Sequence, residues 1–172
     1  MLKLVEPDER YREEYMDFYR DWIHSGEKVV PWVVSEDPSD FFDYIQELKA
    51  QKLEENAPEN FVPHSTYWLL TESGKLVGAA NVRHRLNEYL RIRGGHIGYG
   101  IRPSERKKGY ATAILSMTLE RIKKLGLSEV LVTCDKDNIA SEKTILKNGG
   151  VFEAEFIEED GNAIKRFWIQ NK

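Results

Sequence analysis

The segment that decides the fold spans residues 96–111 and reads HIGYGIRPSERKKGYA. Its first part, His96 to Ile101, is a β-type run that ends at Arg102-Pro103. The residues after it carry an apolar stripe at helical spacing, closed by Gly126 where a left-handed cap is wanted. The stripe consists of Ala111, Ile114, Leu115, Leu119, Ile122 and Leu125. The segment therefore predicts a strand that feeds a helix through a basic turn.

The basic turn has the composition of an anion-binding loop. The first turn of a helix presents backbone N–H groups without partners, and Gly109 lets a phosphate oxygen approach the main chain. Arg106, Lys107 and Lys108 add positive charge, and the small Ala111 does not obstruct the approach. A diphosphate is a good match. The alternative is a basic helix start with solvated charges, because this spacing occurs by chance in about one chain in six of this length. The flanking strand and helix favour the first interpretation.

Working outward, hydrophobic periodicity predicts the order β-α-α-β-β-β-α-β-α-β-β, a layered α/β fold in one domain over residues 1–172. The other expected strands lie at residues 2–4, 66–71, 76–85, 129–134, 152–158 and 164–169. The other expected helices are an aromatic-rich one over 8–24, one capped by Ser39 or Asp40, and one capped by Asn138 that closes at Gly149-Gly150. Residues 87–95 are expected to form a polar connection.

Composition excludes several classes of protein. The 41% hydrophobic residues suffice for a core, and a net charge of -4 offers no general surface for nucleic acid. Cys134 is the only cysteine, which excludes a disulfide within the chain and a thiolate zinc site. This usage and the lack of a signal-like N-terminus predict a cytoplasmic protein. No window approaches the ~20 apolar residues of a membrane span, so no membrane partner is expected.

The turn Arg106-Lys107-Lys108-Gly109-Tyr110-Ala111 resembles the pyrophosphate-binding signature Gln/Arg-x-x-Gly-x-Gly/Ala of the GNAT superfamily of acyl-CoA-dependent N-acyltransferases. The resemblance extends upstream to Tyr99-Gly100-Ile101-Arg102-Pro103. Downstream it includes Asn138-x-x-Ser141 and Gly149-Gly150-Val151-Phe152. The stretch that carries these motifs covers about residues 96–156.

The resemblance implies a mixed, mostly antiparallel sheet that splays between the strands at 96–101 and 129–134, with the arm of acetyl-CoA in the gap. Main-chain groups of Tyr99 and Ile101 would bond the pantetheine and the acetyl carbonyl, and an N–H there would stabilise an oxyanion. No metal is needed. Asn138 is either a helix N-cap, a ligand contact, or both. The implied cofactor-binding residues are Tyr99, Gly100, Ile101, Arg106, Lys107, Lys108, Gly109, Tyr110, Ala111, Thr112, Asn138 and Ser141.

Direct acyl transfer to an amine needs proton transfer, because a lysine-like amine has a pKa of about 10.4 and is protonated at neutral pH. Candidate acid–base residues near the expected splay are His96 and Tyr99 on the strand, Glu88 before it, and Asp135 after the next strand. His96 has the most suitable unperturbed pKa, although its ring could equally be structural. His96 and Tyr99 are the expected catalytic residues.

Two positions bear on the mechanism. Many members of the superfamily carry an acid-supplying tyrosine seven positions beyond the asparagine, where this chain has Ile145. Another tyrosine, water or solvent must then protonate the thiolate of CoA. Cys134 would permit an acyl-enzyme, but a lone cysteine beside an apolar strand is more often a core residue. Direct attack is therefore favoured.

The resemblance places the acceptor pocket at residues 22–42 with help from residues 87–95. Trp32, Glu36, Asp37 and Glu88 are the expected substrate-binding residues, which together could receive a cationic amine. The expected activity is acetyl transfer from acetyl-CoA to a primary amine of a small molecule or peptide, in a monomer or homodimer. A non-catalytic acyl-CoA sensor or interaction module is the alternative. A nucleotide-binding protein is disfavoured, because the chain has neither Gly-x-Gly-x-x-Gly nor Gly-Lys-Ser/Thr.

Overall fold

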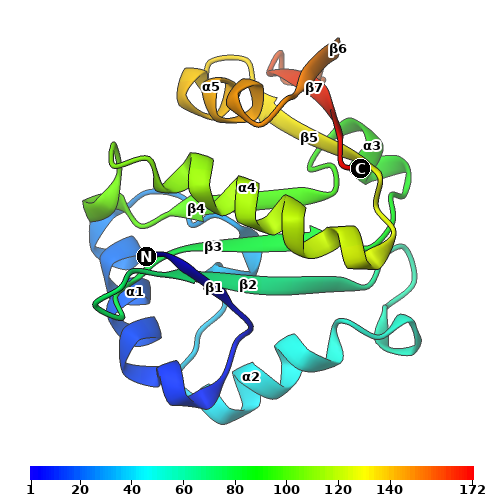
Figure 1. The fold of residues 1–172 in the computed structure, drawn as a ribbon. Coiled ribbons are helices and arrows are strands. Elements are labelled where there is room, and N and C mark those ends of the chain that lie inside the picture. Colours follow the sequence, from blue (N-terminus) through cyan, green and yellow to red (C-terminus); the bar gives the residue numbers. More distant parts are fainter.

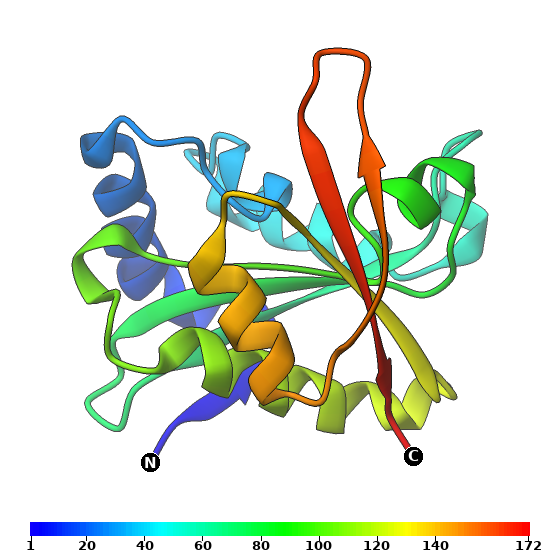
Figure 2. The ribbon, with the colours of Figure 1, turned by 90° about the horizontal axis from the view of Figure 1, so that it is seen from above.

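The strands of the computed structural model, which describes residues 1–172, form two sheets in which all neighbouring strands are antiparallel. The first sheet has the order β1-β2-β3-β4, formed by Lys3–Val5, His64–Leu70, Leu76–Arg83 and Ile97–Ile101. The second has the order β5-β7-β6, formed by Glu129–Asp135, Ala163–Gln170 and Val151–Ile157. Seen from above, the β6–β7 hairpin extends beyond the body of the molecule (Figure 2).

Five α-helices surround the sheets: α1 Arg12–Ser25, α2 Phe41–Ala50, α3 Glu88–Ile92, α4 Tyr110–Ile122 and α5 Ile139–Lys147. Helices α1 and α2 cover one face of the first sheet, while α4 covers the other and lies next to α5 (Figure 1). No helix is long and apolar enough to cross a membrane. The structure holds no group of three or more His, Cys, Asp or Glu side chains arranged for a metal ion.

The element order agrees with the sequence prediction except in one place. Residues 87–95, expected to be a polar connection, contain the short helix α3. Asn87 begins it by accepting a hydrogen bond from the Leu90 amide at 2.9 Å, and Leu90 is its only buried residue. A helix of fewer than two turns shows too few apolar positions for a helical period, which is why the pattern does not reveal it.

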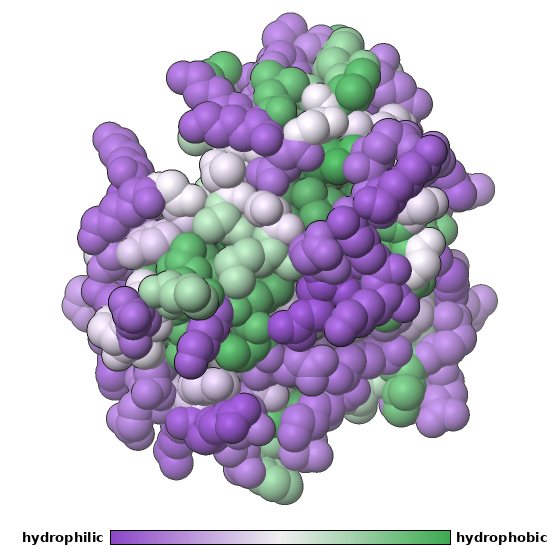
Figure 3. All heavy atoms as spheres, viewed as in Figure 1, coloured by the Kyte–Doolittle hydropathy of each residue, from purple (hydrophilic) through white to green (hydrophobic).

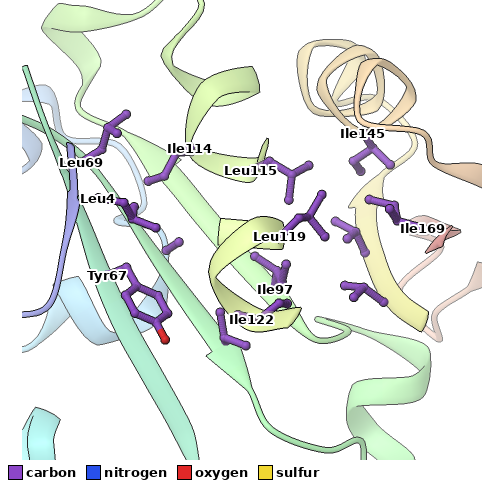
Figure 4. Close-up of a cluster of buried hydrophobic side chains, with 14 of the residues drawn as sticks. Leu4, Tyr67, Leu69, Ile97, Ile114, Leu115, Leu119, Ile122, Ile145 and Ile169 are labelled. Atoms are coloured by element: carbon purple, nitrogen blue, oxygen red, sulfur yellow. The ribbon is translucent and has the colours of Figure 1, made fainter. Parts of the chain in front are cut away.

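Each face of β2 contributes to a different hydrophobic core, because successive side chains point to opposite faces of a strand. Trp68 faces the core formed with α1 and α2. Tyr67 and Leu69 face the core formed with α4 and the second sheet. In this second core, Ile145 of α5 lies near Leu115 of α4 and is fully buried (Figure 4). The core therefore joins both sheets.

The two sheets touch along β4 and β5 and then diverge (Figure 1). At the start of β4, the His96 amide donates to the Leu131 carbonyl at 2.8 Å, and the Leu131 amide donates to His96 Nδ1 at 2.9 Å. No further backbone hydrogen bond joins these strands, and each strand closes a separate sheet. The predicted splay between the strands at 96–101 and 129–134 is confirmed.

Arg102 fastens α1 to the end of β4. Its side chain is buried and donates to Asp17 Oδ2 at 2.9 Å, to Asp21 Oδ2 at 3.2 Å and to the Leu76 carbonyl at 3.1 Å. Asp21 Oδ2 also accepts from the amide of Ser104 at 3.1 Å and from its hydroxyl at 2.9 Å. The first helix is thereby tied to the loop that leads into α4.

We expect Arg102→Met to lower the free energy of unfolding by about 2 kcal/mol, because it leaves Asp21 and the Leu76 carbonyl without their buried partner. This loss is at the lower end of the range for removing a partner from a buried ion pair, because the Asp17 side chain is 57% exposed. Urea denaturation measures the loss. The control Arg10→Met removes an exposed surface pair and should change stability by less than about 0.5 kcal/mol. Equal losses in the two variants would contradict the fastening role.

Candidate active site

A cavity of about 770 Å³ lies where the two sheets separate. Its walls come from β3, β4, β5, the start of α5, and the three loops that precede β2, β4 and the 3-10 helix Trp32–Ser35. The cavity therefore connects the splay to the loops expected to hold an acceptor. The space-filling view shows the opposite side of the first sheet, where hydrophobic atoms gather in the middle of the face that carries α4 (Figure 3).

The main chain of β4 offers unpaired polar groups to the gap. The amide of Arg102 donates to the Val77 carbonyl of β3 at 2.9 Å. Because main-chain groups alternate sides along a strand, those of Tyr99 and Ile101 point the other way, toward β5. The Ile101 carbonyl accepts from Arg106 Nε at 3.3 Å, which leaves the groups of Tyr99 and the Ile101 amide open. An extended polar chain such as pantetheine fits this edge.

The turn before α4 has the backbone of an anion cradle. Lys107 and Gly109 have left-handed backbone, with φ of 64° and 83°, and Gly109 forms the N-cap without a side-chain bond. The first helical hydrogen bond of α4 runs from the Ala113 amide to the Gly109 carbonyl at 3.1 Å. The amides from Lys107 to Thr112 donate to no group in the chain. These amides and the helix dipole fit a diphosphate.

Two of the three basic side chains in this turn form ion pairs that stabilise its conformation. Arg106 Nη2 lies 2.7 Å from Glu27 Oε2, and its guanidinium lies 5.3 Å from the ring centroid of Trp22. Lys108 Nζ lies 2.6 Å from a carboxylate oxygen of Glu105, and this hydrogen bond raises the pKa of the Lys108 ammonium. Lys107 makes no ion pair. The shape of the turn is thus held from α1 and from within the loop.

Tyr99 reaches across the gap from β4 to α5. Its Oη lies 2.9 Å from Ser141 Oγ, and both residues line the cavity. Asn138 also lines the cavity and caps α5 by accepting from the Ser141 amide at 3.1 Å. Burial raises the pKa of Tyr99 to about 12, so the phenol keeps its proton at neutral pH. A protonated hydroxyl therefore stands in the splay although position 145 carries an isoleucine packed in the core.

His96 lies at the vertex of the splay and outside the cavity lining. The ring is 6% exposed, its Nδ1 accepts the Leu131 amide, and its centroid lies 6.4 Å from that of Trp168. Burial lowers the pKa of His96 to about 4. Because the basic nitrogen is occupied and the ring is neutral, this geometry suits a residue that joins the two sheets.

Only one of the four residues expected to bind the acceptor lines the cavity. Trp32 lines the cavity, whereas Glu36, Asp37 and Glu88 do not. Glu36 instead lies beside Glu47, and its pKa is raised by burial and by that second carboxylate. Helix α1 and the turn of the chain after it therefore bring an aromatic side chain, but not these carboxylates, to the cavity.

The residues of β5 that line the cavity are Thr133, Cys134 and Asp135. Burial raises the pKa of the Cys134 thiol to about 11, so it is not a thiolate at neutral pH. Asp135 is the only acidic residue in the lining and accepts from Asn162 Nδ2 at 3.0 Å. Its side chain is 44% exposed, so the carboxylate remains accessible.

The cavity residues that the sequence interpretation did not identify include His64, Asn81 and Arg83. Asn81 Nδ2 lies 2.8 Å from His64 Nδ1, while Asn81 Oδ1 is buried without a partner. Arg83 Nη1 donates to the Gly94 carbonyl at 3.0 Å. Asn81 and Arg83 occupy alternate positions of an otherwise apolar strand, and that pattern is the signal that could have identified them.

Comparisons with known proteins agree with this geometry. A sequence model of the family described as an acetyltransferase (GNAT) domain matches residues 2–151. No curated protein matches the chain significantly.

Solved structures share the fold at low sequence identity. The microcin C7 self immunity acetyltransferase MccE, solved with acetyl-CoA and AMP, is 17% identical with a TM-score of 0.68 over 98% of this chain and 92% of that one. A spermidine N-acetyltransferase SpeG chimera from Vibrio cholerae and hSSAT is 19% identical with a TM-score of 0.65, over 99% and 96%. YncA, a putative acetyltransferase from Salmonella typhimurium with acetyl-CoA, is 14% identical with a TM-score of 0.66, over 99% and 94%. The family match over most of its length shows that this chain belongs to the GNAT acetyltransferases, enzymes whose acyl donor is acetyl-CoA.

Proposed function

We propose that the enzyme transfers the acetyl group of acetyl-CoA to a primary amine by direct attack, without an acyl-enzyme. The observation that carries this proposal is one continuous cavity that holds both the Tyr99 hydroxyl and the open face of the splay, and that extends to Trp32 and His64. A donor in the splay and an acceptor at the aromatic end would then meet beside β4. Effective concentration in such a shared site is a large part of the rate enhancement in group transfer.

The donor-binding residues of the proposal form two groups. The turn of residues 106–112 binds the diphosphate through its open amides, and Gly109 lets it approach closely. The open main-chain groups of Tyr99 and Ile101, with Gly100 between them, bind the pantetheine, while Asn138 and Ser141 border it from α5. When bound, acetyl-CoA supplies the acetyl group as a thioester.

Residues of the cavity can act as the general acid and the general base of the transfer. The acceptor ammonium first loses one proton to become a nucleophilic amine. As its nitrogen bonds to the acetyl carbon and the carbon–sulfur bond breaks, the nitrogen loses a second proton and the sulfur gains one. Tyr99 Oη donates its proton to the sulfur, and Asp135 receives the proton of the amine. An open N–H of β4 stabilises the negative charge that develops on the carbonyl oxygen.

Direct attack agrees with the state of Cys134, whose raised pKa keeps the only cysteine as an unreactive thiol. The alternative of a non-catalytic module depended on the missing tyrosine at position 145, and the hydroxyl of Tyr99 supplies the lacking group. Release of free thiol from acetyl-CoA, assayed over a panel of amines, tests the proposal. Turnover of no amine, with acetyl-CoA binding intact by calorimetry, would support the module instead.

We expect Gly109→Asp to raise the KM for acetyl-CoA at least about tenfold, because the new carboxylate stands against the diphosphate. A Cβ at this position meets no atom within 4 Å, so the effect is one of charge rather than of packing. Gly109→Ala is the matched control, since it shares the left-handed backbone strain without the charge. Steady-state kinetics measure both. An equal KM in the two variants would place the diphosphate elsewhere.

A further inference from the structure

Arg83 is a mostly enclosed cation without a counterion. Its guanidinium makes one hydrogen bond, from Nη1 to the Gly94 carbonyl, and no carboxylate lies within ion-pair distance. Burial lowers the pKa of Arg83 to about 10, and the only group acting against this shift is the Tyr89 phenol. A desolvated charge that no partner balances is costly, and a bound ligand of opposite charge would offset that cost.

The backbone of β4 makes room for this cation inside the cavity. A Cβ built on Gly98 would lie 3.2 Å from each terminal nitrogen of Arg83, so the guanidinium packs over the bare face of that glycine. Gly98 immediately precedes Tyr99, and all three residues line the same cavity. The free N–H groups of Arg83 are thus close to the site of acyl transfer and present the planar fork that matches an acid group.

The side chain of His64, which lies opposite Arg83 in the sheet, also has a free donor. Burial lowers the pKa of His64 to about 4, so its ring is neutral, and its Nδ1 accepts from Asn81. The proton of the ring then sits on Nε2, which can donate to a ligand. The neutral His64 ring can therefore bond an anion without adding a competing negative charge.

Basic residues outnumber acidic residues in the cavity lining. Three basic residues, Lys28, Arg83 and Arg93, and one acidic residue, Asp135, contribute to the wall. Arg93 is already neutralised by an ion pair with Glu158, which lies outside the lining. The cavity is therefore cationic although the whole chain carries a net charge of -4.

We propose that the acceptor is a primary amine that also carries an acid group, a carboxylate or a phosphonate, and that Arg83 binds this group while the amine faces the thioester. This inference rests on the proposed acetyl transfer and names its substrate class. A polycation such as spermidine would meet Arg83 and Lys28 with like charge, so it is a poor acceptor for this cavity.

The test is a thiol-release assay with matched acceptors. The panel contains α-amino acids, β-alanine, 4-aminobutyrate and 2-aminoethylphosphonate, each compared with a neutral amide or ester of the same skeleton, and spermidine. We expect kcat/KM for the best acid to exceed that of its neutral partner by about 30-fold, as for loss of a charge-assisted hydrogen bond. Comparison of the acceptors that carry a carboxylate with the one that carries a phosphonate shows which acid group the site prefers.

Arg83→Met should remove this preference. It should lower kcat/KM for the acid about 30-fold and leave that for the neutral partner within about threefold. Arg85→Met, which changes an exposed arginine outside the cavity, should keep the preference. Calorimetry of the best acid with the CoA-loaded enzyme supplies a readout besides turnover, and unchanged binding of acetyl-CoA shows that the variant is folded.

The outcomes separate the two proposals. Preference for spermidine or neutral amides in the wild-type enzyme, or an acid preference that survives Arg83→Met, would overturn the acid-group inference and leave acyl transfer standing. Turnover of no amine would overturn the proposed transfer, whereas acid binding that depends on Arg83 would still support the acid site.

Discussion

Tyr99→Phe is expected to lower kcat by about 100-fold or more while changing the KM for acetyl-CoA by less than about twofold. The substitution removes only the hydroxyl that lies 2.9 Å from Ser141 Oγ in the splay. The ring still packs against the core, and the main-chain groups that face the gap remain. Steady-state kinetics at saturating acetyl-CoA measure the loss.

The pH dependence of the wild-type enzyme supplies a second readout. A phenol with a raised pKa of about 12 holds its proton between pH 6 and 10, so kcat should show no decline on the alkaline side of that range from Tyr99. Tyr19→Phe changes a tyrosine of α1 outside the cavity and should leave kcat unaltered. If Tyr99→Phe raised KM and left kcat intact, the hydroxyl would be a binding group and another proton donor would be required.

Gly100→Ala is expected to lower the free energy of unfolding by about 4 kcal/mol and to weaken binding of the acceptor. The added Cβ would lie 2.1 Å from the Val30 carbonyl oxygen and 2.8 Å from its Cγ2. Because backbone on both sides is involved, no side-chain rotation relieves the overlap. Val30 and its neighbours line the cavity, so their displacement must also change the KM for the acceptor.

Gly98→Ala is the matched control on the same face of β4. Its Cβ meets only the ends of the Arg83 side chain at 3.2 Å, and a flexible side chain can move by a few tenths of an ångström. The stability loss should stay below about 1 kcal/mol. Urea denaturation of both variants compares them. Equal losses would show that the loop at Val30 yields easily and does not form a fixed wall.

Local patterns predicted most of the elements because each depends on neighbours in the chain. Asp40 and Asn138 cap their helices through amides three residues ahead, at 3.1 Å in both cases. Gly126 ends the α4 region with a left-handed φ of 75°, as expected. Helix α3 was missed because its stability comes from one cap and one buried leucine, which leave no periodic signal.

The turn that we propose for the donor follows from local sequence, whereas the wall that we propose for the acceptor does not, for a physical reason. The turn proposed to bind the diphosphate is made of consecutive residues, and its open amides follow from a strand, a glycine and a helix start. The acceptor wall joins β2, β3 and the loops before β2 and β4, so its members are far apart in the chain. The acidic residues expected there lie elsewhere. The absence of a carboxylate within ion-pair distance of Arg83 is a property of the folded chain alone.

The sequence by itself determined the helix caps, the strand-to-helix turn and, through the motif at residues 106–111, the donor. Only the tertiary structure decided which side chains share the cavity. It carried the Tyr99 hydroxyl to Ser141 across the splay and used His96 to join the two sheets. It also enclosed Arg83 over Gly98 without a counterion. Such placements depend on packing between distant segments, because burial and the approach of opposite charges are properties of the folded chain.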